Sequence, residues 1–232
     1  MRLLPIDINP ALFLLPDGDE ENVRDIPVIK LIPSLAVSPR ALIFKRCFDV
    51  IFSLAVMIAG APLFFMLYLV TRFTSEGPAF YRQERLGKFG KPFMMYKFRS
   101  MYVDAERSGP KLSSENDPRI TKWGRVMRIT RLDELPQFWN VLKGDMSLVG
   151  PRPERGHFAK KIMERDPNYR KLSQLKPGLT SIGQVVFGYA ENVDEMCIRL
   201  QHDLTYLNDM SFNSDLRIIL QTVRVMVQKK GK

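Results

Sequence analysis

The residues best suited to chemistry are two adjacent carboxylates, Asp133 and Glu134. The pattern around them predicts a helix over 133–143, and the first turn of a helix favours anions through its dipole and free N–H groups. Arg128 and Arg131 precede the pair and are placed to hold phosphate oxygens. A carboxylate can attack phosphorus to give an acyl phosphate, and carboxylates are oxygen ligands that Mg²⁺ prefers. Most adjacent carboxylates are only solvated helix starts, so the neighbouring arginines and apolar patches favour a catalytic role.

Other basic residues are candidates for phosphate contacts. Arg152 lies between two prolines, which fix the backbone on both sides and present its guanidinium from a stiff loop. A structural turn with an incidental arginine is the alternative. Lys97 and Arg99 are either diphosphate contacts or a solvated strand face. Asp203 and Asp215, nearer the C-terminus, are local caps, surface acids or site residues.

The most apolar segment is 50–70, which holds 21 residues without a charge. About 20 apolar residues are needed to cross a bilayer as a helix. Pro62 lies near its centre and is expected to break the helix, while basic residues flank both ends instead of one. We expect the helix to enter the membrane, break near Pro62 and return to the cytoplasmic side. A kinked spanning helix is the second interpretation, and a buried core helix is the third.

The remaining pattern predicts a mainly α fold with a few short strands, an α+β class. Apolar residues at spacings of 3 and 4 predict a helix over 193–208, and Ser214 is expected to cap the next one. A short strand is expected at 93–96 and a polar loop at 104–118. The basic amphipathic segment 119–131 either lies in a membrane interface or packs on a core as a solvated helix.

Charge is distributed unevenly along the chain. The first 40 residues hold six acids and four bases, a net charge of −2. The whole chain has a net charge of +10, so the remaining residues carry +12. A basic body binds anionic partners such as phosphorylated substrates, anionic lipids or nucleic acid. Two histidines and two cysteines exclude a His-rich metal site and a disulfide framework. We expect three parts: an N-terminal extension over 1–40, a re-entrant membrane helix over 41–73, and a membrane-associated catalytic domain over 74–232.

Long motifs spread over most of 45–220 resemble the bacterial sugar transferase family, the monotopic polyprenyl-phosphate phosphoglycosyl transferases. The matching segments are KRCFDVIFSL, GPAFYRQERLGKFGKPFMMYKFRSM, TRLDELPQFWNVLKGDMSLVGPRPE and KPGLT. The resemblance implies a re-entrant helix hairpin with interfacial amphipathic helices, on the cytoplasmic face of a bacterial inner membrane. It also implies Mg²⁺ dependence and a ping-pong reaction.

In the reaction that the resemblance implies, Asp133 attacks the β-phosphate of a UDP-sugar and UMP leaves. Polyprenyl (undecaprenyl) phosphate then takes the phospho-sugar from the covalent enzyme, which begins polysaccharide or glycoconjugate assembly. Glu134 would help with the metal or with protons, and the two carboxylates would hold Mg²⁺. The family's other motif residues fall on Lys97, Arg152, Asp203 and Asp215. The expected partners are the donor, the lipid acceptor and anionic lipids, but not nucleic acid, and a homo-oligomer is compatible.

Two positions depart from the family pattern. The membrane break often reads Ser-Pro, but here it is Ala61-Pro62, so the hairpin must be held by other groups. A Thr-Gly pair after the arginine loop is replaced by Thr180-Ser181, so a backbone angle that only glycine adopts easily would be lost there.

Two rival functions remain open. A non-enzymatic, membrane-anchored basic module would explain the charge and the apolar segment, but not the stiff arginine loop or the carboxylate pair. An ordinary glycosyltransferase would move the sugar without its phosphate. Metal-dependent release of UMP from a UDP-sugar separates all three, because the module releases nothing and the glycosyltransferase releases UDP.

Overall fold

A computed structural model describes residues 13–14, 38–107, 109–114 and 116–228. Helices dominate and the strands are short, which confirms the predicted mainly α class with some β structure. The N-terminal elements are β1 (Phe13–Leu14), α1 (Pro39–Ala59), α2 (Ala61–Thr74), β2 (Phe80–Leu86), the 3₁₀ turn η3 (Lys88–Gly90) and β3 (Pro92–Phe98). The middle elements are α3 (Lys122–Ile129), the 3₁₀ turn η4 (Leu132–Glu134), α4 (Gln137–Lys143) and β4 (Ser147–Val149). The last elements are α5 (Gly156–Arg165), α6 (Tyr169–Leu172), β5 (Gly178–Thr180), α7 (Ile182–Val186), α8 (Val193–Asn208) and α9 (Phe212–Val227).

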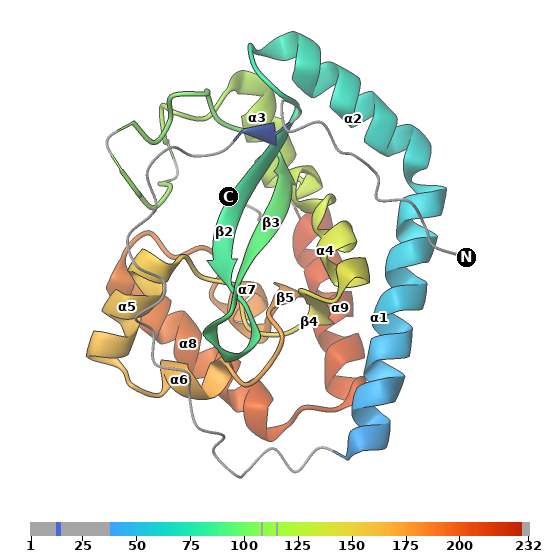
Figure 1. The fold of residues 1–232 in the computed structure, drawn as a ribbon, viewed down its shortest axis with the longest axis vertical. Coiled ribbons are helices and arrows are strands. Elements are labelled where there is room, and N and C mark those ends of the chain that lie inside the picture. Colours follow the sequence, from blue (N-terminus) through green and yellow to red (C-terminus); the bar gives the residue numbers. More distant parts are fainter. Residues whose placement is uncertain (1–12, 15–37, 108, 115, 229–232) are drawn as a thin grey trace.

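The antiparallel hairpin of β2 and β3 lies in the middle of the molecule, with Phe80 opposite Phe98 and Leu86 opposite Pro92. Helices α1 and α2 run along one side of it, and α5, α6 and α8 lie on the other (Figure 1). The two-residue β1 pairs with β2 in parallel, and β4 pairs with β5 in parallel. The strand expected at 93–96 is therefore present and longer than expected.

The apolar segment forms two helices that meet at a bend of 65°. No single helix in the described part of the chain is both long and apolar enough to cross a bilayer, whereas α1 and α2 together are. The bend lies at Gly60, two residues before Pro62, so the break falls near the proline as expected from sequence. Pro62 lies in the first turn of α2, where the N–H that proline lacks has no helical partner in any case.

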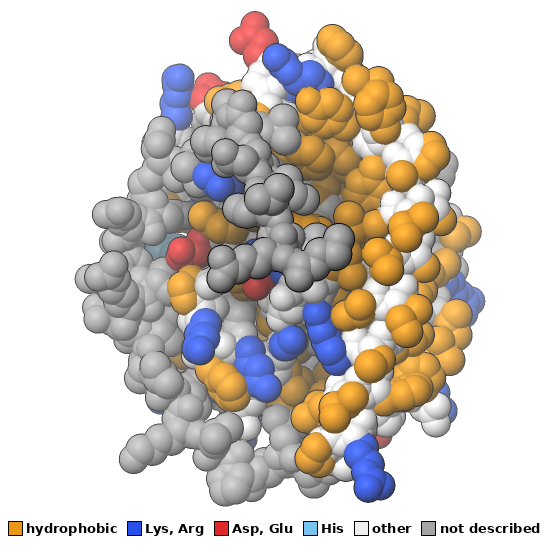
Figure 2. All heavy atoms as spheres, turned by 45° about the vertical axis from the view of Figure 1, so that its right-hand side comes forward, with side chains coloured by type: hydrophobic (Ala, Val, Ile, Leu, Met, Phe, Trp, Pro, Cys, Tyr) orange, Lys and Arg blue, Asp and Glu red, His pale blue; other side chains and the backbone are white. Residues whose placement is uncertain are grey.

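The outer face of this bent helix pair is apolar, as the orange side chains of Figure 2 show. Large apolar side chains on both arms are more than half exposed: Ile43, Phe44, Ile51, Ile58, Phe65 and Phe73. An apolar surface of this extent on a soluble monomer is unusual, and such surfaces mark contacts with membranes or other proteins.

Buried polar contacts attach the first arm to the rest of the chain. Lys45 forms an ion pair with Asp215 on α9 at 2.5 Å. Arg46 donates to two carbonyls in the last turn of α4, at 2.6 and 2.9 Å. Asp49 accepts from a hydroxyl and a backbone N–H of β4, at 2.7 and 3.2 Å. One helical turn of α1 therefore holds α4, β4 and α9.

The second arm is attached near its C-terminus. Thr71 is fully buried, and its hydroxyl accepts a hydrogen bond from Trp123 Nε1 on α3 at 3.1 Å. Arg99 donates to the carbonyls of Thr71 and Ser75, at 3.2 and 2.7 Å, and to that of Pro78. These contacts fix the second helix of the bent pair to the rest of the chain, although Ala61 stands where the family often has a serine.

The C-terminal helices agree closely with the sequence pattern. Helix α8 has the bounds expected from the apolar spacing, 193–208. Helix α9 begins three residues earlier than expected: Ser211 is its N-cap in place of Ser214, and Ser214 completes a capping box. The described residues of 104–118 form no helix or strand, as expected of a loop. Within 119–131, α3 buries Met127 completely, so this helix packs on a core through one face.

Candidate active site

The two adjacent carboxylates do not open a regular α-helix, which corrects the helix expected over 133–143. Arg131 has a left-handed backbone (φ 59°) and starts the single 3₁₀ turn η4, and Pro136 separates this turn from α4. The support from a helix dipole that was expected for the pair does not apply to one short turn. The turn buries both side chains, so that Asp133 is 3% and Glu134 6% exposed.

Glu134 is surrounded by cations from three segments. Its carboxylate lies 2.9 Å from Lys97 Nζ on β3, 3.3 Å from Arg131 Nη1 and 3.7 Å from Arg152 Nη2. Burial opposes ionisation, but the attraction of these three cations outweighs it and holds the pKa of Glu134 well below its usual range. Glu134 is therefore ionised and acts as the shared counter-ion of the three bases.

Asp133 has a different environment although it is the adjacent residue. In the described part of the chain its buried Oδ1 atom has no hydrogen-bond partner. Burial raises the pKa of Asp133 to about 6 against the attraction of Lys97, with the neighbouring Glu134 adding to the rise and Arg128 opposing it. The carboxylate is thus largely ionised at neutral pH and has a free oxygen, which suits a nucleophile or a metal ligand.

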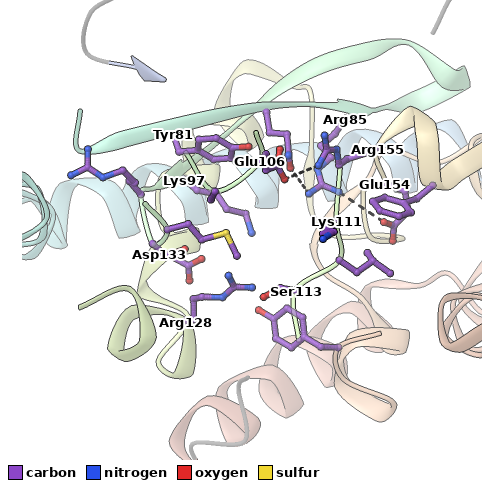
Figure 3. A pocket seen from close by; sticks show the side chains of 18 of the residues that line it. Tyr81, Arg85, Lys97, Glu106, Lys111, Ser113, Arg128, Asp133, Glu154 and Arg155 are labelled. Carbon is purple, nitrogen blue, oxygen red and sulfur yellow. Dashed lines mark hydrogen bonds and ion pairs between the residues drawn. The ribbon is translucent and has the colours of Figure 1, made fainter. Parts of the chain in front are cut away.

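Asp133 opens into a cavity of about 440 Å³, a size typical of small-molecule sites. Figure 3 shows Lys97 and Arg128 beside Asp133 at one end, with Arg85 and Arg155 at the other. Nine lysine or arginine side chains and four acidic ones line the cavity. This excess of positive charge suits a polyanionic ligand such as a diphosphate.

An aromatic ring forms part of the wall near the carboxylates. The ring centroid of Tyr189 lies 4.6 Å from the guanidinium carbon of Arg131 and 5.5 Å from that of Arg152. Such cation–π contacts keep the two guanidinium groups in place without using their N–H donors. Nothing in the sequence marked Tyr189, because it lies far from both arginines along the chain and follows no recognisable motif.

Most of the predicted site residues come together here. Asp133, Lys97, Arg128 and Arg152 line the cavity, and Arg131 and Glu134 lie directly behind them. Arg99 also lines the cavity, but its guanidinium donates to carbonyls at the end of α2 and so is not free for a diphosphate. Arg155 also lines the cavity and was not expected. It is paired with Glu106 of the loop at 2.8 Å.

The two acids of the C-terminal helices lie elsewhere. Neither Asp203 nor Asp215 is among the described residues that line the cavity. Asp203 Oδ1 accepts from the backbone N–H of Gly183 at 2.8 Å. Asp215 accepts from the hydroxyl of Tyr206 and from Lys45, both at 2.5 Å. The contacts of both acids are with the chain itself.

The residues around Asp133 and Glu134 fit a divalent cation only in part. The described residues contain no group of three or more His, Cys, Asp or Glu side chains suited to a metal ion. Glu134 is occupied by three cations, whereas Asp133 Oδ1 has no partner. Since Mg²⁺ commonly binds through one or two carboxylates and substrate phosphates, Asp133 is the carboxylate of the pair that would hold such an ion.

The comparisons with known proteins define the class. The model of the bacterial sugar transferase family matches residues 40–229, and the chain belongs to this family. It is 38% identical over 198 residues to UDP-N-acetylgalactosamine-undecaprenyl-phosphate N-acetylgalactosaminephosphotransferase of Aeromonas hydrophila, covering 85% of this chain and 47% of that protein.

Two UDP-glucose:undecaprenyl-phosphate glucose-1-phosphate transferases are also similar. The protein from Caulobacter vibrioides is 36% identical over 224 residues, which cover 94% of this chain and 78% of that one. The protein from Klebsiella pneumoniae is 37% identical over 205 residues, which cover 88% and 44%. The chain therefore spans slightly less than half the length of the Aeromonas and Klebsiella relatives.

Proposed function

We propose that the protein transfers a sugar 1-phosphate from a UDP-sugar to undecaprenyl phosphate, releasing UMP and giving a polyprenyl-diphosphate-sugar. One observation carries the proposal: a buried carboxylate with a free oxygen, Asp133, opens into a strongly basic cavity. The relatives' names support it, since each describes transfer of a sugar phosphate to undecaprenyl phosphate. The reaction would be the first membrane step in assembly of a polysaccharide or glycoconjugate.

The proposed chemistry has two steps. In the first, an Asp133 oxygen forms a bond to the β-phosphorus, and the bond from this phosphorus to the bridging oxygen breaks, so that UMP leaves with the electron pair. In the second, a phosphate oxygen of the lipid acceptor attacks the same phosphorus and displaces the carboxylate. Asp133 is thereby regenerated, and the order is ping-pong.

The surrounding residues would position and neutralise the donor. Lys97, Arg128 and Arg152 are placed to contact phosphate oxygens at the Asp133 end of the cavity. Glu134 would keep Lys97 and Arg152 ordered as their counter-ion, a role that fits its contacts better than the metal or proton role expected from sequence. A Mg²⁺ ion held by Asp133 and the diphosphate would supply charge neutralisation.

The fold also supports a position at a membrane. We propose that α1 and α2 form a re-entrant hairpin, with both ends on the cytoplasmic face of the bacterial inner membrane. The bent apolar pair, its exposed outer face and the basic residues at both ends support this monotopic placement. The lipid acceptor would then reach the cavity from the membrane side, and anionic lipids would contact the basic flanks.

The nucleotide product tests the proposal. The full chain in nanodiscs with Mg²⁺, undecaprenyl phosphate and each of a panel of UDP-sugars should release UMP with at least one sugar. Asp133→Asn should abolish release, whereas Glu164→Gln, which neutralises an exposed acid on α5, should leave it unchanged. Release of UDP would favour the ordinary glycosyltransferase, and no nucleotide release would favour the binding module.

A further inference from the structure

One buried carboxylate outside the cavity lies where three segments of the chain meet: α8, the start of α7 and the loop that carries Arg152. Asp203, on α8, is 4% exposed. It accepts from the backbone N–H of Gly183 at 2.8 Å, and the backbone N–H of Arg152 and the hydroxyl of Ser181 lie close enough to lower its pKa. Burial raises the pKa of Asp203 to about 6 against the effect of these three groups, so the carboxylate is largely ionised at neutral pH.

A second side chain on the same face of α8 holds the same loop. Arg199 Nη2 lies 2.5 Å from Glu154 Oε1, and both side chains are at most 7% exposed. Residues four apart on a helix project from one face, so Arg199 and Asp203 lie side by side. Glu154 follows Arg152 by two residues in the same loop. Helix α8 therefore contacts this loop, the arginine loop, through one basic and one acidic side chain.

Asp203 also fixes the segment that carries Tyr189. Ser181 is the N-cap of α7, and Tyr189 follows the end of this short helix by three residues. The approach of α7 to α8 is close, because a Cβ atom at Gly183 would lie 2.6 Å from Arg199 Cγ and 2.9 Å from Asp203 Oδ1. The same carboxylate thus holds the backbone on both sides of the contact between Tyr189 and the Arg152 guanidinium.

We propose that Asp203 is a positioning residue, which sets the place of the Arg152 guanidinium through the backbone of the arginine loop and the start of α7. It does not touch the substrate. The inference deepens the proposed function, because it takes Arg152 as a contact to the donor diphosphate. Asparagine at 203 keeps the size and one acceptor oxygen but replaces the other with an NH₂ donor and removes the negative charge that attracts the donors of Gly183, Arg152 and Ser181.

A double-mutant cycle tests whether Asp203 acts through Arg152. Asp203→Asn should reduce kcat/KM for UMP release about 10- to 100-fold, mainly by raising KM for the UDP-sugar, and should change it less than about twofold when combined with Arg152→Gln. The matched control is Asp215→Asn, because this acid is equally buried but contacts Lys45 and Tyr206. Its effect should be the same with and without Arg152→Gln.

Hydrogen exchange gives a second readout that needs no turnover. In the folded Asp203→Asn protein, amides of 150–156 and 182–190 should exchange at least about tenfold faster than in the wild type, whereas Asp215→Asn should leave both peptides unchanged. Additive effects of Asp203→Asn and Arg152→Gln, or unchanged exchange in both peptides, would overturn the inference. If the wild type releases no UMP, the proposed function fails, and the exchange comparison alone decides whether Asp203 holds the loop.

Discussion

Replacing Asp133 with asparagine should abolish activity and also stabilise the fold above pH 6. Burial raises the pKa of Asp133 to about 6 from an ordinary value of 3.8, so the folded state disfavours the ionised form. Asparagine has nearly the same shape and carries no charge. The stabilisation should therefore be absent below pH 4, grow between pH 4 and 6, and be complete above pH 6.

The size of this effect follows from the shift in pKa. A difference of about two units, at about 1.4 kcal/mol per unit, corresponds to roughly 3 kcal/mol of unfolding free energy. For a chain of this length, 1 kcal/mol changes Tm by about 2–4 °C, so Asp133→Asn should raise Tm by about 6–12 °C at pH 8.

Thermal unfolding in one detergent at pH 8 and pH 4, followed by tryptophan fluorescence, measures the effect. Glu134→Gln is the matched control of opposite sign, because the cations around Glu134 hold its pKa below the ordinary value of 4.5. Its stabilising charge is present above that value and is lost as the pH falls, so Glu134→Gln should lower Tm at pH 8. An unchanged or lower Tm for Asp133→Asn at pH 8 would refute the reasoning about buried charge.

Three further changes test other parts of the structure. Pro62→Leu should leave the bend in place, because the break lies two residues earlier and both helices are attached to the rest of the chain. The test is a cysteine-free protein with a single cysteine placed on either flank of the helix pair. Labelling of only one flank by a membrane-impermeant thiol reagent would contradict this prediction. Asp49→Ala should lower the unfolding free energy by about 2–4 kcal/mol, measured with urea, because it leaves two buried donors of β4 without an acceptor; a loss below 0.5 kcal/mol would contradict it. Lys97→Met should shift the acidic limb of the UMP-release profile to higher pH, since Lys97 lowers the pKa of Asp133, and Glu134→Gln should shift it to lower pH; the same limb in both variants would show that Asp133 does not set it.

Local patterns in the sequence were sufficient to predict those helices and strands whose apolar residues recur with a regular period. The bounds of α8 followed from its apolar spacing, and Gly144, at φ 91°, ends α4 as expected. The cluster of Asp133, Arg128 and Arg152 was also expected, because the three residues share a basic, phosphate-binding chemistry around one carboxylate. In each case the determining residues are neighbours in sequence or carry chemistry that only a few sites use.

Features that depend on tertiary packing were not predictable in the same way. The left-handed backbone of Arg131 converts the start of the expected helix into a 3₁₀ turn, and no local preference of arginine indicates this. The role of Arg99 as a cap depends on the C-terminus of α2, which approaches β3 only in the folded chain. Asp203 and Asp215 were selected through the resemblance, which identifies important acids without showing what they contact.

The departure from the family at Ser181 has a simple explanation in the structure. Its backbone is extended (φ −141°), a conformation open to any residue, so no glycine is required. Its hydroxyl accepts from the N–H of Gln184 at 3.0 Å and caps α7. The substitution therefore strengthens the segment instead of straining it.

The covalent step is the central claim, and one measurement tests it most directly. The enzyme with Mg²⁺ and a UDP-sugar labelled in both the sugar and the β-phosphate, but without lipid acceptor, should give one equivalent of UMP and a labelled protein. The label should map to Asp133 and be released by hydroxylamine, as expected of an acyl phosphate, and Asp133→Asn should take up none. Adding undecaprenyl phosphate should then move the label to the lipid. UMP release that strictly requires the acceptor, with no labelled protein at any time, would contradict the account.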